Sequence, residues 1–411
     1  MLAAVALAST KMATTRIRAA CFLCFLAAPL PAAALLQDRV EVFAGENVTY
    51  DDNLFRLSKD VDPKAVIGSD ERSDTVSTTS VGASLDLPYS LQRFQASFTW
   101  FANRYRRFDE LNFNGHAARA AWLWSVTPEL TGDLGYTDTG DLSNFATKPG
   151  PTGRVKDILR TKQGSADGVW FPVASWRLNA GAAAVEQRHS DSSQQFNDID
   201  TATGVGGVSY VTAADDRLGI EGRFERGRTP HDELRGTAFD LAYHQDGVGI
   251  VGHWVATGHS ILDGRVDWVR RDYDQRSSRD WTGPTFRFAH TWTPTGKLTV
   301  ASSIYRDIGP VADVQSGSFV LVRGLAVKPS WAVTDKITVA GDAEYNIWEY
   351  RGDVLFGDYT HRVRTFGLNL SYRATEKILL QAGYAYELRT STAPLSDYKD
   401  NMVNVSARVG F

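Results

Sequence analysis

Polar and apolar residues alternate along most of the chain. In the segment 92–103, Phe94, Phe98 and Trp100 share one face, while Arg93 and Gln95 lie on the other. The segments 337–347 and 378–389 alternate in the same way. A period of two is typical of β-strands. These runs match the roughly 9–11 residues that a tilted strand needs to cross a bilayer, and exceed the usual 5–6 of a soluble strand.

A recurrent sequence motif separates the strands. It consists of an aromatic residue, then Thr or Pro with a charged residue, then a new alternating run. Clear copies span 124–130, 292–298, 331–337 and 372–378, and looser copies begin near Tyr89, Trp176, Tyr210 and Trp254. A period near forty residues could indicate a β-propeller, but no Trp-Asp pair occurs. Each copy of the motif instead predicts a tight turn between two long strands. One aromatic per turn would form a ring at a membrane interface; the predicted members are Tyr89, Trp124, Trp176, Tyr210, Trp254, Trp292, Trp331 and Tyr372.

The turns also predict the strand count. Eight turns join sixteen strands, and the segments 40–50 and 398–411 add one at each end. We therefore expect an all-β, transmembrane, antiparallel up-and-down barrel of about 18 strands, with both termini in the periplasm. Sixteen strands stay open, because the pattern is weakest at 236–258. The long polar segments 58–73, 141–162 and 190–200 are predicted extracellular loops.

The last segment ends on an aromatic residue. Val403, Val405 and Val409 alternate with polar positions up to Phe411. A C-terminal aromatic on such a strand resembles the recognition signal of the barrel-assembly machinery, so we assign that role to Phe411. In a soluble protein the same strand would be an exposed edge prone to aggregation.

The N-terminal segment is typical of a signal peptide. Basic residues precede an apolar run, and the small residues 32–34 predict cleavage after Ala34. The predicted domains are therefore a signal peptide at 1–34, whose true start could be Met12, and one barrel domain at 35–411. Both cysteines, Cys21 and Cys24, lie in the signal peptide, so the mature chain has no disulfide or thiol site. The predicted location is the outer membrane of a Gram-negative bacterium.

Charge patterning indicates what lines the barrel. The net charge of -4 and its even spread argue against a nucleic-acid partner. Arg or Lys facing lipid at mid-bilayer costs about 2–4 kcal/mol, so charges within strands should face the lumen. The candidates are Arg93, Glu221, Arg223, Glu225, Asp263, Arg265, Asp267, Arg271, Asp342, Glu344, Glu387 and Arg389. They are consistent with a polar conduit and equally with a salt-bridged wall.

The sequence assigns no catalytic residue, metal or cofactor. His253, His259, Ser260 and Asp263 lie close together, but His259 and Ser260 fall at a predicted turn. The acidic run 51–53 could bind Ca²⁺, although such a run more often begins a solvated loop.

Several sequence segments resemble the EpsL-type outer-membrane β-barrel proteins, which accompany exopolysaccharide and exosortase (PEP-CTERM) gene clusters. They are residues 48–56, 71–75, 119–124 and 291–298. The resemblance implies a role in exopolysaccharide biosynthesis or export. It also implies the polymer, other export proteins, outer-membrane lipid and the barrel-assembly machinery as partners. A general or solute-specific diffusion porin and a barrel enzyme modifying polysaccharide or lipid stay open as alternatives.

Overall fold

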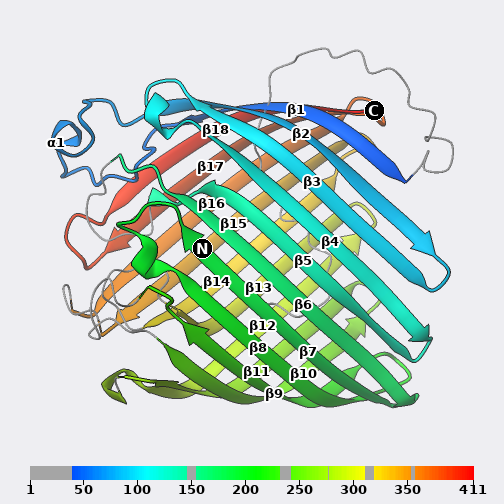
Figure 1. The fold of residues 1–411 in the computed structure, drawn as a ribbon. Coiled ribbons are helices and arrows are strands. Elements are labelled where there is room, and N and C mark those ends of the chain that lie inside the picture. The colour runs from blue at the N-terminus through cyan, green and yellow to red at the C-terminus, as the bar shows by residue number, and fades with distance from the viewer. Residues whose placement is uncertain (1–38, 146–153, 232–241, 276, 311–318, 353–356) are drawn as a thin grey trace.

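The protein folds into one closed β-barrel (Figure 1). The computed structural model describes residues 39–145, 154–231, 242–275, 277–310, 319–352 and 357–411, so the predicted signal peptide lies outside the described residues. The sheet has 18 strands, and every pairing joins strands that follow each other in the chain, except that β1 pairs with β18 to close the barrel. The predicted closed, antiparallel all-β barrel and its count of about 18 strands are confirmed.

The strands are long, as their alternation predicts. They are β1 Val40–Asp51, β2 Asp74–Tyr89, β3 Gln92–Tyr105, β4 Phe113–Thr127, β5 Leu130–Leu142, β6 Ile158–Val173, β7 Trp176–His189, β8 Ile199–Val211, β9 Arg217–Arg228, β10 Tyr243–Thr257, β11 Ser260–Tyr273, β12 Trp281–Thr295, β13 Leu298–Pro310, β14 Phe319–Ala332, β15 Ile337–Arg351, β16 Tyr359–Arg373, β17 Ile378–Ser391 and β18 Tyr398–Gly410. The short helical pieces are α1 Pro63–Ile67, η2 Asp109–Leu111, η4 Gln195–Asn197 and η7 Ser277–Arg279. Among the described residues, no helix is long and apolar enough to span a membrane.

The two ends of the barrel differ. All eight predicted turns join their strands at one end, which we call the turn end, and the longer connections lie at the other, the loop end. Two predicted loops were too long. β5 continues to Leu142 and β6 begins at Ile158, so Asp141 and residues 158–162 belong to strands; β8 begins at Ile199. Backbone pairing at the loop end extends strands whose polar side chains look loop-like in sequence.

The alternation separates an apolar outer face from a polar inner face. On β9, Leu218 and Ile220 are 65% and 60% exposed, whereas Glu221 and Glu225, on the opposite face, form side-chain contacts within the barrel. On β16, Phe366 and Leu368 are both 49% exposed. Large apolar side chains exposed around a closed barrel form the band that faces lipid.

The junction between β1 and β2 has the fewest backbone-paired residues in the described wall. Backbone pairing joins these strands only at Val40–Val42, whereas β1 pairs with β18 along residues 43–51. Beyond that short ladder, Glu46 accepts hydrogen bonds from the hydroxyls of Ser77 and Thr79, the latter at 2.8 Å. Glu46 lies on the same face of β1 as the exposed Val48, yet it is only 3% exposed because β2 covers it. Side-chain hydrogen bonds therefore join β1 to β2 along this seam, where backbone pairing between the two strands is absent.

At the loop end, the β1–β2 connection folds into a small apolar core. Its side chains, together with two from the β3–β4 connection, are Phe55, Leu57, Val61, Ile67, Phe108 and Leu111. Asp62 caps α1 by accepting from the Lys64 N–H, and Gly68 ends the helix at φ +66°, where a side chain would be strained. This loop is thus a folded element.

Candidate functional site

The lumen wall is the candidate site, because it carries the predicted charged side chains together with their ion-pair partners. All twelve predicted lumen residues lie on the face opposite the exposed apolar side chains of their strands. Closed-barrel alternation thereby directs them inward.

One charge cluster lies on β7, β9 and β11. Arg265 forms ion pairs with Glu221 on β9 and with Asp267 on its own strand, the latter at 2.6 Å. The side-chain amide of Asn179 on β7 donates to the same Glu221 at 3.1 Å. These charges compensate each other along the wall.

Nearer the loop end, Arg271 is fully buried in the same wall. Its Nε donates to the Gln245 side chain at 2.9 Å, and its guanidinium lies 4.0 Å from the centre of the Tyr243 ring. The Tyr243 hydroxyl in turn donates to Glu225 at 2.7 Å, and Glu225 lies 3.6 Å from Arg271. A buried arginine needs such pairing, since desolvating a charge costs several kcal/mol.

A second cluster occupies β14 and β15. Lys328 contacts Glu344 at 2.5 Å and Asp342 at 3.3 Å. The Tyr305 hydroxyl donates to Asn346 at 2.7 Å beside them. Lys328 was not predicted; it stands on the face opposite the large exposed side chains Leu325, Val327 and Trp331 of its strand, which is the signal that could have found it.

A third cluster joins β17 and β18. Glu387 accepts a hydrogen bond from the Tyr398 hydroxyl, and Arg389 lies over the Tyr398 ring at 4.4 Å. Arg389 also donates to the backbone carbonyl of Ser396 at 2.7 Å. Near the turn end, Arg93 pairs with Asp86 across β2 and β3, with Nε 2.7 Å from the carboxylate.

The Ser, His and Asp residues that lie close in sequence do not form one site. His253 contacts Asp263 at 2.7 Å on the inner face. Ser260, the first residue of β11, hydrogen-bonds at 2.8 Å with His290 on the outer face. Because alternation sends the two pairs to opposite sides of the wall, these four residues give no triad geometry.

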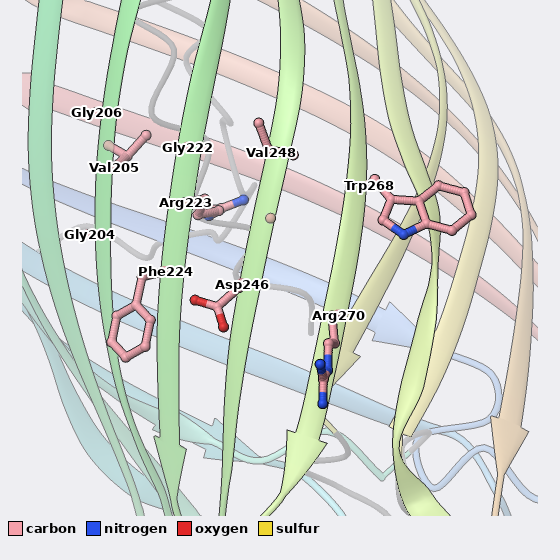
Figure 2. A pocket seen from close by; sticks show the side chains of 11 residues that line it. Gly204, Val205, Gly206, Gly222, Arg223, Phe224, Asp246, Val248, Trp268 and Arg270 are labelled. Atoms are coloured by element: carbon pink, nitrogen blue, oxygen red, sulfur yellow. The ribbon is translucent and has the colours of Figure 1, made fainter.

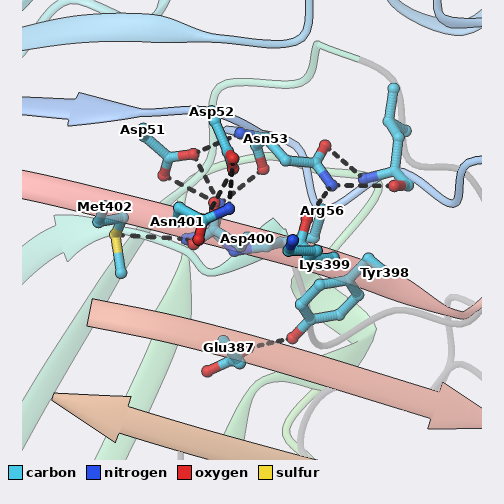
Figure 3. A network of polar contacts seen from close by, with 11 residues as sticks. Asp51, Asp52, Asn53, Arg56, Glu387, Tyr398, Lys399, Asp400, Asn401 and Met402 are labelled. Atoms are coloured by element: carbon cyan, nitrogen blue, oxygen red, sulfur yellow. Dashed lines mark hydrogen bonds and ion pairs between the residues drawn. The ribbon is translucent and has the colours of Figure 1, made fainter. Parts of the chain in front are cut away.

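The acidic run at the end of β1 is occupied by an arginine (Figure 3). Asp51, Asp52 and Asp400 bring carboxylates together, but Arg56 forms ion pairs with Asp51 and Asp400, both at 2.9 Å. Burial would lower the Arg56 pKa, yet these carboxylates raise it above its ordinary value. The guanidinium supplies the positive charge that a cation would bring, so the cluster fits a structural clamp better than a Ca²⁺ site.

Sequence reasoning missed Arg56. Its φ of +56° is a conformation that costs a non-glycine residue about 1–2 kcal/mol. Asn53 stabilises the same bend, since its side chain donates to the backbone carbonyls of Leu57 and Lys399 at 2.9 and 3.0 Å. The clamp therefore holds the β1–β2 loop against β18 at the loop end of the lumen.

The predicted interface aromatics all lie at the turn end, each near the strand terminus next to its turn. Seven of the eight are exposed, from 40% for Tyr372 to 70% for Tyr89. Trp124 is half-buried because its indole packs over Gly132, where a Cβ would come within 2.4 Å of the ring. Phe411 follows β18, 60% exposed, and its N–H donates to the Val42 carbonyl at 2.8 Å.

Comparison with known proteins agrees with this architecture. Residues 246–411 match the family model described as "Putative beta-barrel porin 2". The chain is a porin-like β-barrel of the Gram-negative outer membrane. No curated protein is significantly similar to it in sequence.

Several solved structures are similar to this chain over most of its length. OccAB3 of Acinetobacter baumannii is 12% identical, with a TM-score of 0.48 over 90% of this chain and 99% of that one. OccK2 (OpdF) of Pseudomonas aeruginosa is 10% identical, with a TM-score of 0.49 over 91% and 98%. The BenF-like porin of Pseudomonas fluorescens Pf-5 is 9% identical, with a TM-score of 0.49 over 91% and 99%.

Proposed function

We propose that the chain is a diffusion porin for small hydrophilic solutes. The observation that carries the proposal is the polar inner face of a closed 18-strand barrel, whose charges pair along the wall. A barrel of this strand number is too wide for its side chains to fill. Charges held against the wall leave the centre of the lumen to water and solute.

A few inward charges act on a passing solute more directly. Asp133 and Asp167 are Cα partners on β5 and β6, and among the described residues neither forms an ion pair. Arg177 on β7 and Arg217 on β9 also stand on the inner face without an ion pair to any described residue. Uncompensated groups of both signs favour polar solutes of either charge over strong ion selectivity.

Planar-bilayer recording tests this proposal. The wild-type channel should show stable ohmic conductance, and its reversal potential in a KCl gradient should lie close to zero. Arg177→Ala with Arg217→Ala should shift the channel toward cations, and Asp133→Asn with Asp167→Asn toward anions. No conductance from folded barrels, or no shift from either pair, would contradict a solute path lined by these residues.

Exopolysaccharide export, which the EpsL resemblance implies, stays the second candidate. A wide polar lumen suits a hydrophilic polymer as well as a small solute. The distribution of exopolysaccharide between medium and periplasm in a deletion strain separates the two. Polymer trapped in the periplasm supports export, and normal secretion with slowed uptake of small solutes supports the porin.

A further inference from the structure

The outer wall between β8 and β11 carries an unusual order of side chains from one membrane interface to the other. At the turn end, Tyr210 and Trp254 are 48% and 55% exposed. An apolar stretch follows, with Ile220 and Ile250 as Cα partners. Towards the loop end the outward residues become charged, at Arg226, Arg228, Asp246 and Arg270. One interface is therefore aromatic and the other charged.

A shallow groove of about 570 Å³ lies in this wall, just before the charged rows (Figure 2). Gly204, Gly206 and Gly222 line it, and Phe224 and Trp268 stand at its sides. A Cβ at Gly204 would meet nothing within 4 Å, and one at Gly206 or Gly222 only a backbone oxygen at 3.9 Å. Packing of the barrel therefore does not require the groove to be open.

Charged side chains line one end of the groove. Phe224, Asp246 and Arg270 form one row across three strands, as their Cα pairing shows (Figure 2). Arg270 is 66% exposed and contacts Asp272 at 2.8 Å. In the rows beyond, Arg226 and Arg228 are exposed, and among the described residues neither has an ion-pair partner. Asp246 and the paired Arg270 thus line the end of the groove, and the two arginines without an ion pair stand just beyond it on the surface that faces the membrane.

The depth of these arginines matches the far side of the bilayer. Leu218, near the turn end of β9, precedes Arg226 by eight residues and Arg228 by ten. At roughly 3.3 Å per residue and a tilt near 40°, the arginines stand about 20–25 Å above Leu218. The apolar band of such barrels is about 25 Å tall. The guanidinium groups therefore reach headgroup level, where exposure costs little.

We propose that this wall binds a phosphorylated lipid of the outer leaflet. The headgroup phosphate pairs with Arg226 and Arg228, and Arg270 lies beside it. One acyl chain lies in the groove against Phe224 and Trp268. Guanidinium groups suit phosphate because they donate paired hydrogen bonds in one plane. Long loops face outward in bacterial barrels, so the loop end meets the leaflet that carries such lipids. The site needs the barrel to be in the membrane but does not depend on what crosses the lumen.

The test compares lipid binding by purified barrels in detergent. Bisphosphorylated lipid A should be retained by the wild type in native mass spectrometry and should raise its Tm. Arg226→Gln with Arg228→Gln should weaken binding at least about tenfold, because the charge-assisted contacts are lost. Gly222→Leu, which fills open space and should fold normally, should also weaken it. Arg362→Gln is the matched control, since Arg362 faces outward near the loop end of β16, away from the groove.

The other outcomes separate the competing occupants. Equal binding of dephosphorylated lipid A, or equal loss in Arg362→Gln, overturns the site, since phosphate or position then does not matter. If millimolar inorganic phosphate displaces lipid A while Gly222→Leu has no effect on binding, the arginines form a simple anion site. That result also overturns the proposed lipid site. A changed oligomeric state in Gly222→Leu, with lipid binding intact, identifies a second copy of the chain as the occupant.

Discussion

Replacing Arg56 by alanine should release the β1–β2 loop from the barrel wall. The side chain of Arg56 is 12% exposed, and its partners Asp51 and Asp400 are 6% and 0% exposed. Removing one partner from a buried ion pair typically costs about 3–5 kcal/mol, because it leaves an uncompensated buried charge. Two carboxylates lose their partner here, so the change should lie in that range.

Limited trypsin digestion at Lys59 and Lys64, both exposed in this loop, measures the release. If opening is fast relative to cleavage, the cleavage rate follows the population of the open loop. A cost of about 3 kcal/mol then corresponds to roughly a hundredfold faster cleavage. Urea unfolding of the barrel in lipid vesicles tells a local effect from a global one.

Two variants control this experiment. Asp70→Ala breaks the exposed Lys64–Asp70 pair in the same loop, whose side chains are 68% and 77% exposed, and should change cleavage little. Arg56→Ala combined with Asp400→Asn should recover much of the lost protection, since the buried charge is removed. Cleavage of Arg56→Ala within threefold of wild type would refute the clamp. Failure of Asp400→Asn to rescue would refute its electrostatic explanation.

Three further outcomes follow from the structure. The Asp157 carboxylate is buried, which by itself raises its pKa, but His189 and a backbone N–H lower this pKa overall. The ionised carboxylate therefore stabilises the fold at pH values above the ordinary pKa near 3.9. This stabilisation is lost as the pH falls through the lowered pKa. Pepsin cleavage of residues 190–198 should therefore rise below about pH 4, and Asp157→Asn should abolish that pH dependence. Glu46→Ala should lower the free energy of unfolding by about 1–3 kcal/mol in urea titrations, because two hydroxyls at the seam lose their acceptor; a change below about 0.5 kcal/mol would mean the seam is sealed otherwise. Phe411→Ala should reduce barrel assembly in cells while leaving the urea stability of refolded barrel unchanged; normal assembly would remove its role as a signal.

Much of the fold could be predicted because barrel strands follow a local rule. Phe94, Phe98 and Trp100 alternate with polar residues wherever β3 lies, since one face must meet lipid. The tight turns at 124–130 and 292–298 show where the chain reverses, and successive antiparallel strands then pair with their neighbours. Alternation similarly places Arg265 and Glu344 on the lumen face before any pairing is known.

Contacts between distant strands could not be predicted in this way. Arg56 meets Asp400 only because closure brings β1 beside β18, more than 340 residues later in the chain. Ser260 meets His290, and not His253, because register and face decide which neighbours touch. The extension of β5 and β6 beyond the expected strand ends arose for the same reason, since backbone hydrogen bonds to a neighbour are invisible in either segment alone. Local patterning thus determines faces, turns and strand order, whereas partners, seams and grooves depend on closure.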